Sequence, residues 1–104
     1  MCHGQSQALR EVQRCIRALH CPTRWRIIQC IGAEERSTRE IFEELGLGEE
    51  ISLAGLYYHL SALKGAGIVE VASYRESKAG TPEKVWRLKT RRIVIDLLED
   101  FEVK

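Results

Sequence analysis

A helical pattern that runs directly into a strand pattern, over residues 52–71, constrains the fold of this chain most strongly. Four leucines recur there at intervals of three or four residues: Leu53, Leu56, Leu60 and Leu63. At about 100° per residue they share one face of a helix, which must be buried against other helices. The opposite face carries small residues beside Tyr58, and a glycine such as Gly55 costs roughly 0.5–1 kcal/mol relative to alanine but allows close approach to the backbone. The segment therefore predicts a helix that is buried on one side and open to a partner on the other.

The length and composition predict one soluble globular domain. The chain has 104 residues, of which 44% are hydrophobic and 30% charged, and these proportions are ordinary for a folded soluble protein. No apolar run approaches the roughly 18 residues of a membrane-spanning helix, and the first ten residues lack the hydrophobic core of a secretion signal. We therefore expect a single domain over residues 1–104 that stays in the cytoplasm and does not contact a membrane.

The net charge of +1 hides a segregation of charge along the chain. Residues 10–26 and 75–92 are basic, whereas residues 34–50 carry seven glutamates against two arginines. Basic segments are typical of surfaces that bind phosphate groups. The acidic segment weighs against such binding, because a carboxylate within a Debye length of about 8 Å repels a phosphate.

Capping and turn residues divide the chain into elements. Helices are predicted over residues 5–20, 22–31, 37–45, 53–64 and 90–103, and strands over 68–74 and 84–88. Trp25, Ile28 and Ile31 are expected to face inward from the second helix. Ser37 with Glu40 forms a capping-box pattern, and Ser52 is the expected N-cap of the leucine helix. The order predicts a mainly α (α+β) winged helix-turn-helix with a two-stranded wing.

Polar and basic side chains on this framework are candidates for binding double-stranded DNA. A helix in the major groove needs hydrogen-bonding groups with little bulk, and nearby Lys and Arg supply affinity for phosphates. Tyr57 lies nearer the leucine stripe and has a competing interpretation as core, so Tyr58 is the better candidate. The predicted DNA-binding residues are Thr38, Arg39, Ser52, Tyr57, Tyr58, His59, Ser61, Arg75, Lys78 and Lys84.

Several short motifs together resemble the arsenical-resistance (ArsR-like) family of winged-helix repressors. They are the Pro22-Thr23-Arg24 helix start, the His59-Leu60 pair, the Ala66-Gly67-Ile68-Val69 exit into the wing and the Trp86-Arg87-Leu88 return. The resemblance covers residues 19–88 and implies a homodimer joined by the first and last helices, over residues 1–21 and 90–104. The implied interface residues are Leu9, Val12, Ile16, Ile93, Leu97, Leu98 and Phe101.

The sensing chemistry of that family does not carry over to this sequence. Where arsenic- and cadmium-responsive members have a cysteine-containing segment, residues 39–43 contain no thiol, and the last predicted helix offers no histidine. The cysteines form no Cys-x-x-Cys pair, and Cys15 falls on an apolar stripe, so packing is the favoured role. We therefore expect no metal and no cofactor. A thiol or metal site would have to draw on Cys2 with His3, or on Cys15 with His20 and Cys21.

The sequence thus favours a sequence-specific DNA-binding transcriptional regulator, a homodimeric repressor of the ArsR-like type. Two alternatives remain open: a winged-helix module that binds a protein rather than DNA, and a thiol- or metal-responsive repressor. An enzyme is not expected, because the chain has no glycine-rich phosphate loop and no plausible Ser-His-Asp arrangement.

Overall fold

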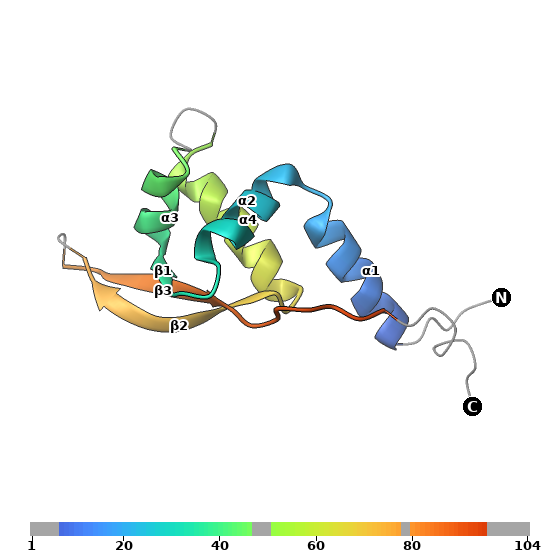
Figure 1. Cartoon of the computed structure of the whole chain (residues 1–104). Coiled ribbons are helices and arrows are strands. Elements are labelled where there is room, and N and C mark those ends of the chain that lie inside the picture. The colour runs from blue at the N-terminus through green and yellow to red at the C-terminus, as the bar shows by residue number, and fades with distance from the viewer. Residues whose placement is uncertain (1–6, 47–50, 78–79, 96–104) are drawn as a thin grey trace.

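The computed structural model of the chain describes residues 7–46, 51–77 and 80–95. Within these ranges four helices and three strands follow one another: α1 (Gln7–Leu19), α2 (Pro22–Ile31), β1 (Arg36–Ser37), α3 (Thr38–Glu44), α4 (Leu53–Gly65), β2 (Val69–Glu76) and β3 (Pro82–Leu88). The strands form one antiparallel sheet in the order β1-β3-β2, and the helices lie together on one side of it (Figure 1). The winged helix-turn-helix prediction is confirmed. Within the described ranges, no helix is both long and apolar enough to cross a membrane.

The two helices of the helix-turn-helix begin at the predicted caps. The Ser37 hydroxyl accepts from the Glu40 N–H at 3.1 Å, and the Glu40 carboxylate accepts from the Ser37 N–H at 2.8 Å, which completes a capping box. At the start of α4 the Ser52 hydroxyl accepts from the Gly55 N–H at 3.0 Å. These local bonds satisfy amides that the first turn of a helix leaves without partners, so short sequence patterns suffice to place both helices.

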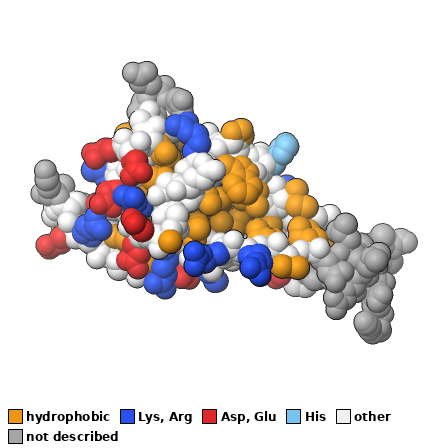
Figure 2. Space-filling model, in the orientation of Figure 1, with side chains coloured by type: hydrophobic (Ala, Val, Ile, Leu, Met, Phe, Trp, Pro, Cys, Tyr) orange, Lys and Arg blue, Asp and Glu red, His pale blue; other side chains and the backbone are white. Residues whose placement is uncertain are grey.

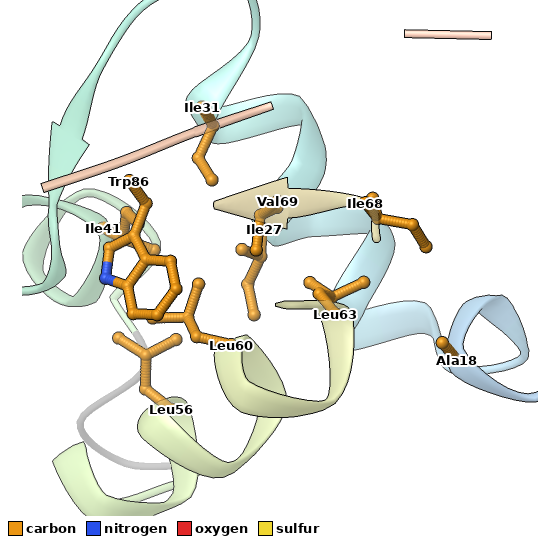
Figure 3. Close-up of a cluster of buried hydrophobic side chains, with 10 residues drawn as sticks. All are labelled: Ala18, Ile27, Ile31, Ile41, Leu56, Leu60, Leu63, Ile68, Val69 and Trp86. Atoms are coloured by element: carbon orange, nitrogen blue, oxygen red, sulfur yellow. The ribbon is translucent and has the colours of Figure 1, made fainter. Parts of the chain in front are cut away.

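The leucine stripe of α4 forms the centre of the core. Leu56, Leu60 and Leu63 are completely buried, and Leu53 is partly buried at the edge. Figure 3 shows the three buried leucines converging with side chains of the other elements, chiefly Ile27, Ile31, Ile41, Val69 and Trp86. Because this face is occupied by the core, the other face of α4 is left at the surface.

Trp25 does not face inward, contrary to prediction. Its side chain is 46% exposed, and its indole N–H donates to the Leu19 carbonyl at 2.7 Å. The completely buried position on α2 is instead Ile27, with Ile31 one turn later. The polar N–H of a tryptophan needs a partner, and the carbonyl of the last residue of α1 supplies one at the surface.

The sheet has a third strand that the sequence pattern did not predict. Arg36 and Ser37 pair with Trp86 and Val85 of β3, so the predicted two-stranded wing is extended by β1 on its other edge. A strand of two residues has no periodicity to detect, and its pairing partner is about fifty residues away in the sequence. Its effect is to fix the start of α3 against the base of the hairpin.

The helix predicted to begin at Thr90 is not present over residues 90–95, which follow β3 without regular secondary structure. The Thr90 hydroxyl donates to the Gly67 carbonyl at 2.8 Å, and the N–H groups of Lys89 and Thr90 both point to the Ile68 carbonyl. These tertiary bonds tie the backbone to the start of β2 where the local pattern favoured a helix. The remainder of that prediction, with Leu97, Leu98 and Phe101, lies outside the described residues.

Candidate nucleic-acid interface

The exposed face of α4 carries the central residues of the predicted interface. Tyr58 is 66% exposed, and Ser61 lies on the same open side. Ser52 is exposed at the N-terminal end, where its hydroxyl already accepts the Gly55 amide. The small residue Ala54 is also exposed between them, so the face has hydrogen-bonding groups with little bulk.

Tyr57 lies on the flank of α4 that faces the hairpin. It is half-buried and, with Leu53, lines a groove of about 730 Å³ between α3, α4 and the hairpin tip. It is therefore neither a fully buried core residue nor a freely exposed one. The groove is lined by residues of α3, α4 and the β2–β3 hairpin, the three elements that carry the predicted DNA-binding residues.

His59 lies on the other flank of α4 and contacts the start of α2. Its Nδ1 accepts a hydrogen bond from the Arg24 Nε–H at 3.0 Å, and its ring meets the Tyr58 ring edge-on with the centroids 5.6 Å apart. Burial, and then the charge of Arg24, lower the pKa of His59. Arg24 is not among the residues that the sequence predicts for the site. It contacts His59 across 35 positions of the sequence, and no spacing rule predicts a contact of that kind.

The basic side chains of the hairpin are less available than the sequence suggested. The Arg75 guanidinium forms an ion pair with Glu40 of α3 at 3.0 Å, and Arg87 pairs with Glu70 at 2.7 Å. Lys84 is half-buried, with its ammonium 5.8 Å from the centre of the Trp86 ring. Lys78 lies outside the described residues. Figure 2 shows the result as interspersed red and blue over α3 and the hairpin, and not as one basic surface.

Thr38, one of the predicted DNA-binding residues, has a buried side chain. It is 1% exposed, and its hydroxyl accepts the Trp86 indole N–H at 2.8 Å inside the protein. The pairing of β1 with β3 draws this residue inward. Arg39, the next residue, is exposed, while its backbone N–H donates to the Glu83 carboxylate at 2.8 Å.

The acidic residues of α3 and the hairpin share the groove with the basic ones. Four glutamates line it beside Arg39 and Arg75, namely Glu40, Glu43, Glu76 and Glu83. The hydrogen bond from Ser37 and then the charge of Arg75 lower the pKa of Glu40, so this carboxylate is ionised at neutral pH. The local balance of charge in the groove is therefore negative.

The cysteines in the described part of the chain do not converge. Cys15 on α1 contacts the Ala66 carbonyl at 3.5 Å, and Cys21 is half-buried before α2. Burial, followed by the neighbouring Glu44 carboxylate, raises the pKa of the Cys30 thiol, which disfavours the thiolate needed for metal binding. Among the described residues there is no group of three potential metal ligands; Cys2 and His3 fall outside them.

The described members of the predicted dimer interface lie at or near the surface. Leu9 and Val12 are half-buried on α1, and Ile16 of the same helix is 54% exposed. Ile93, in the irregular segment after β3, is 41% exposed. In Figure 1 that segment runs toward the end of the molecule where α1 begins.

Comparisons with known proteins agree with this fold. A family model described as a helix-turn-helix domain matches residues 18–72, which is more than half of the chain. A possible transcriptional regulatory protein from Mycobacterium bovis (fragment 1–100) is 25% identical, with 84% of this chain and 83% of that chain covered and a TM-score of 0.67. Reduced HlyU from Vibrio cholerae is 20% identical, with 80% and 77% covered and a TM-score of 0.61, and shows the fold alone. No curated protein matches the chain.

A second structure from Mycobacterium bovis is also similar. It is the solution structure of the homodimeric winged helix-turn-helix DNA-binding domain of Mb0332, a possible ArsR-family transcriptional regulator, and it is 26% identical with a TM-score of 0.62. The match covers 86% of this chain and 77% of that chain. The family model, the described fold and these likenesses agree, and the chain belongs to the ArsR-like winged helix-turn-helix family of transcriptional regulators.

Proposed function

We propose that this protein is a sequence-specific DNA-binding transcriptional regulator that acts as a cytoplasmic homodimer. The observation that carries the proposal is the division of α4 into two faces. Three leucines are completely buried on one, while Tyr58 and Ser61 are exposed on the other. A helix built in this way is supported rigidly from behind and presents polar groups to the major groove.

Base edges and phosphates are contacted by different residues in this proposal. Tyr58, His59 and Ser61 present hydroxyl and imidazole groups to base edges, with Ser52 and Tyr57 at the margins. Arg39, Arg75 and Lys84, together with Lys78, bind phosphates and set the register on the duplex. Because α4 contains no arginine, the two-bond contact to guanine is missing. We expect modest sequence preference in each half-site.

Dimerisation supplies the remaining specificity. The exposed Ile16 and Ile93 support an interface between two copies, and Mb0332 is described as homodimeric. A two-fold dimer places its recognition helices about 34–36 Å apart, one turn of DNA, so the preferred operator is an inverted repeat.

A mobility-shift titration at several salt concentrations tests the proposal. The binding constant of the wild-type protein for the duplex that it enriches from a random-sequence pool should fall steeply as salt rises. Lys84→Ala and Arg75→Ala should each reduce the slope by about 1. Arg14→Ala, which removes an exposed charge from α1, is the matched control and should leave the slope unchanged. A wild-type protein that binds no duplex at low salt contradicts the proposal.

The composition of the groove favours a second candidate, a module that binds a basic protein segment. Four glutamates face two arginines there, a balance that attracts cations and repels phosphates. Affinity capture that returns one stable protein partner without nucleic acid supports this candidate. Reversal of charge at Glu43 and Glu83 should then abolish capture.

A further inference from the structure

The contact between Arg24 and His59 joins three helices at the proposed DNA-binding face. The Arg24 guanidinium donates through Nε to His59 Nδ1 at 3.0 Å and through Nη1 to the Ala18 carbonyl at 3.2 Å. Its central carbon also lies 5.7 Å from the centre of the Tyr58 ring. One side chain from the first turn of α2 therefore anchors on the end of α1 and holds two adjacent residues of α4.

This contact determines which nitrogen of His59 carries the proton. An arginine side chain has only donors and keeps its proton at any physiological pH, so the nitrogen that it contacts must be an acceptor. The neutral imidazole must then carry its hydrogen on Nε2. Burial and the Arg24 charge, which lower the His59 pKa, favour this neutral form. Within the described part of the chain, Nε2 has no hydrogen-bond partner.

We propose that Arg24 is a positioning residue for DNA recognition, which holds His59 as an Nε2–H donor toward acceptor atoms of base edges in the major groove. Such a donor pairs with purine N7, guanine O6 or thymine O4, and it rejects the amino groups of cytosine and adenine. Arg24 also fixes the ring of Tyr58 over its guanidinium, so both side chains enter the groove with their orientations already set. This role rests on the proposed function.

The first experiment uses the protein alone. Nitrogen NMR of the ¹⁵N-labelled full chain reports which ring nitrogen of His59 is protonated. We expect the proton on Nε2 in the wild type and a mixture of both tautomers in Arg24→Lys. Lysine keeps the positive charge but lacks the rigid, planar guanidinium that directs its N–H toward Nδ1. The matched control is Arg26→Lys, which alters an arginine on the same helix that donates to the Leu45 carbonyl. A proton on Nδ1 in the wild type, or an equal change in the control, overturns the proposal.

The second experiment measures specificity on the duplex that the wild type enriches from a random-sequence pool, against a scrambled duplex. Arg24→Lys and His59→Ala should each lower the ratio of the two affinities by about 5- to 150-fold for the base-pair position that His59 reads in a half-site, the usual cost of one mismatched base pair. The double variant should lose less than the sum of the two single losses, because Arg24 acts mainly through His59.

The outcomes separate this role from the proposed function. Additive losses in the double variant, or unchanged specificity in Arg24→Lys, overturn the role of Arg24 while DNA binding by the wild type stands. A wild type that enriches no duplex overturns both. Amide NMR spectra of each variant, compared with that of the wild type, confirm that the variants are folded.

Discussion

Glu40 shows how one side chain serves the fold and restrains the proposed interface. One carboxylate oxygen accepts the Ser37 N–H at 2.8 Å and completes the capping box of α3. The other pairs with Arg75 at 3.0 Å, and Arg75 is one of the residues proposed to bind phosphate. DNA must therefore displace a carboxylate before it can use this arginine.

Replacing Glu40 by glutamine separates the two roles. Glutamine still accepts the Ser37 amide, so the capping box and the stability of α3 should persist. Arg75 loses its ionic partner, and since an exposed ion pair contributes about 0–1 kcal/mol, affinity for DNA should rise by up to about fivefold. Glu43→Gln removes a carboxylate from the same groove and serves as the control, with a smaller rise expected. Equal affinities for Glu40→Gln and the wild type in a mobility-shift titration would contradict this account.

His59 should make the stability of the fold depend on pH. Burial and the Arg24 charge lower its pKa below the usual 6.5, so the unfolded chain binds a proton more readily than the folded one. The free energy of unfolding contributed by this group is complete above pH 6.5 and decreases as the pH falls through the lowered folded-state pKa. Urea unfolding at about pH 7.5 and about pH 5 should show a smaller decrease for His59→Gln than for the wild type. His20→Gln, on an exposed residue, should retain the full decrease.

The helices that could be predicted are those whose ends are determined locally. Ser37 and Ser52 bond amides within three residues, so a short pattern places both helices correctly. The leucine stripe of α4 also predicts which face is buried. Tyr58 lies on the opposite face, so its exposure follows from the same pattern. Fold and recognition helix were therefore accessible from the sequence.

The elements that could not be predicted depend on distant partners. Strand β1 pairs with β3, and Thr90 bonds to Gly67 where a helix was expected. Distant partners also change the predicted site. The Trp86 indole N–H bonds to the Thr38 hydroxyl inside the protein, and the Glu40 carboxylate forms an ion pair with Arg75. Each contact joins residues more than 20 positions apart, and hydrophobic periodicity carries no information on such pairs.

The Thr38 hydroxyl makes two hydrogen bonds at the junction of β1, α3 and β3: it accepts from the Trp86 indole N–H at 2.8 Å and donates to the Lys84 carbonyl at 3.4 Å. Thr38→Val keeps the shape of the side chain but leaves the indole N–H buried without a partner. We expect a loss of about 1–3 kcal/mol in the free energy of unfolding, measured by urea denaturation. Ser61→Ala, at an exposed position of α4, should change it by no more than about 0.5 kcal/mol. A neutral Thr38→Val would show that these bonds do not stabilise the junction.

At the scale of the whole molecule, we propose that DNA binding and dimerisation use two different surfaces. The open face of α4 and the hairpin are assigned to DNA, while the apolar residues of α1 and of residues 93–95 are assigned to a second copy. Neither assignment uses residues of the other, so the two can be disrupted separately. A dimer defect should weaken DNA binding only because the two half-sites are no longer linked.

Ile16→Glu tests this separation. Burying an isoleucine stabilises an interface by about 1.5–3 kcal/mol, and two-fold symmetry places Ile16 in it twice, so a charge there should convert the dimer to monomer. Sedimentation velocity measures the change. Arg14→Glu, an exposed position about 200° around the same helix, alters the charge more and should leave the dimer intact. The Ile16→Glu monomer should still bind a single half-site, with the weak affinity of one domain. Dimers that persist in Ile16→Glu would place the contact between copies on another surface.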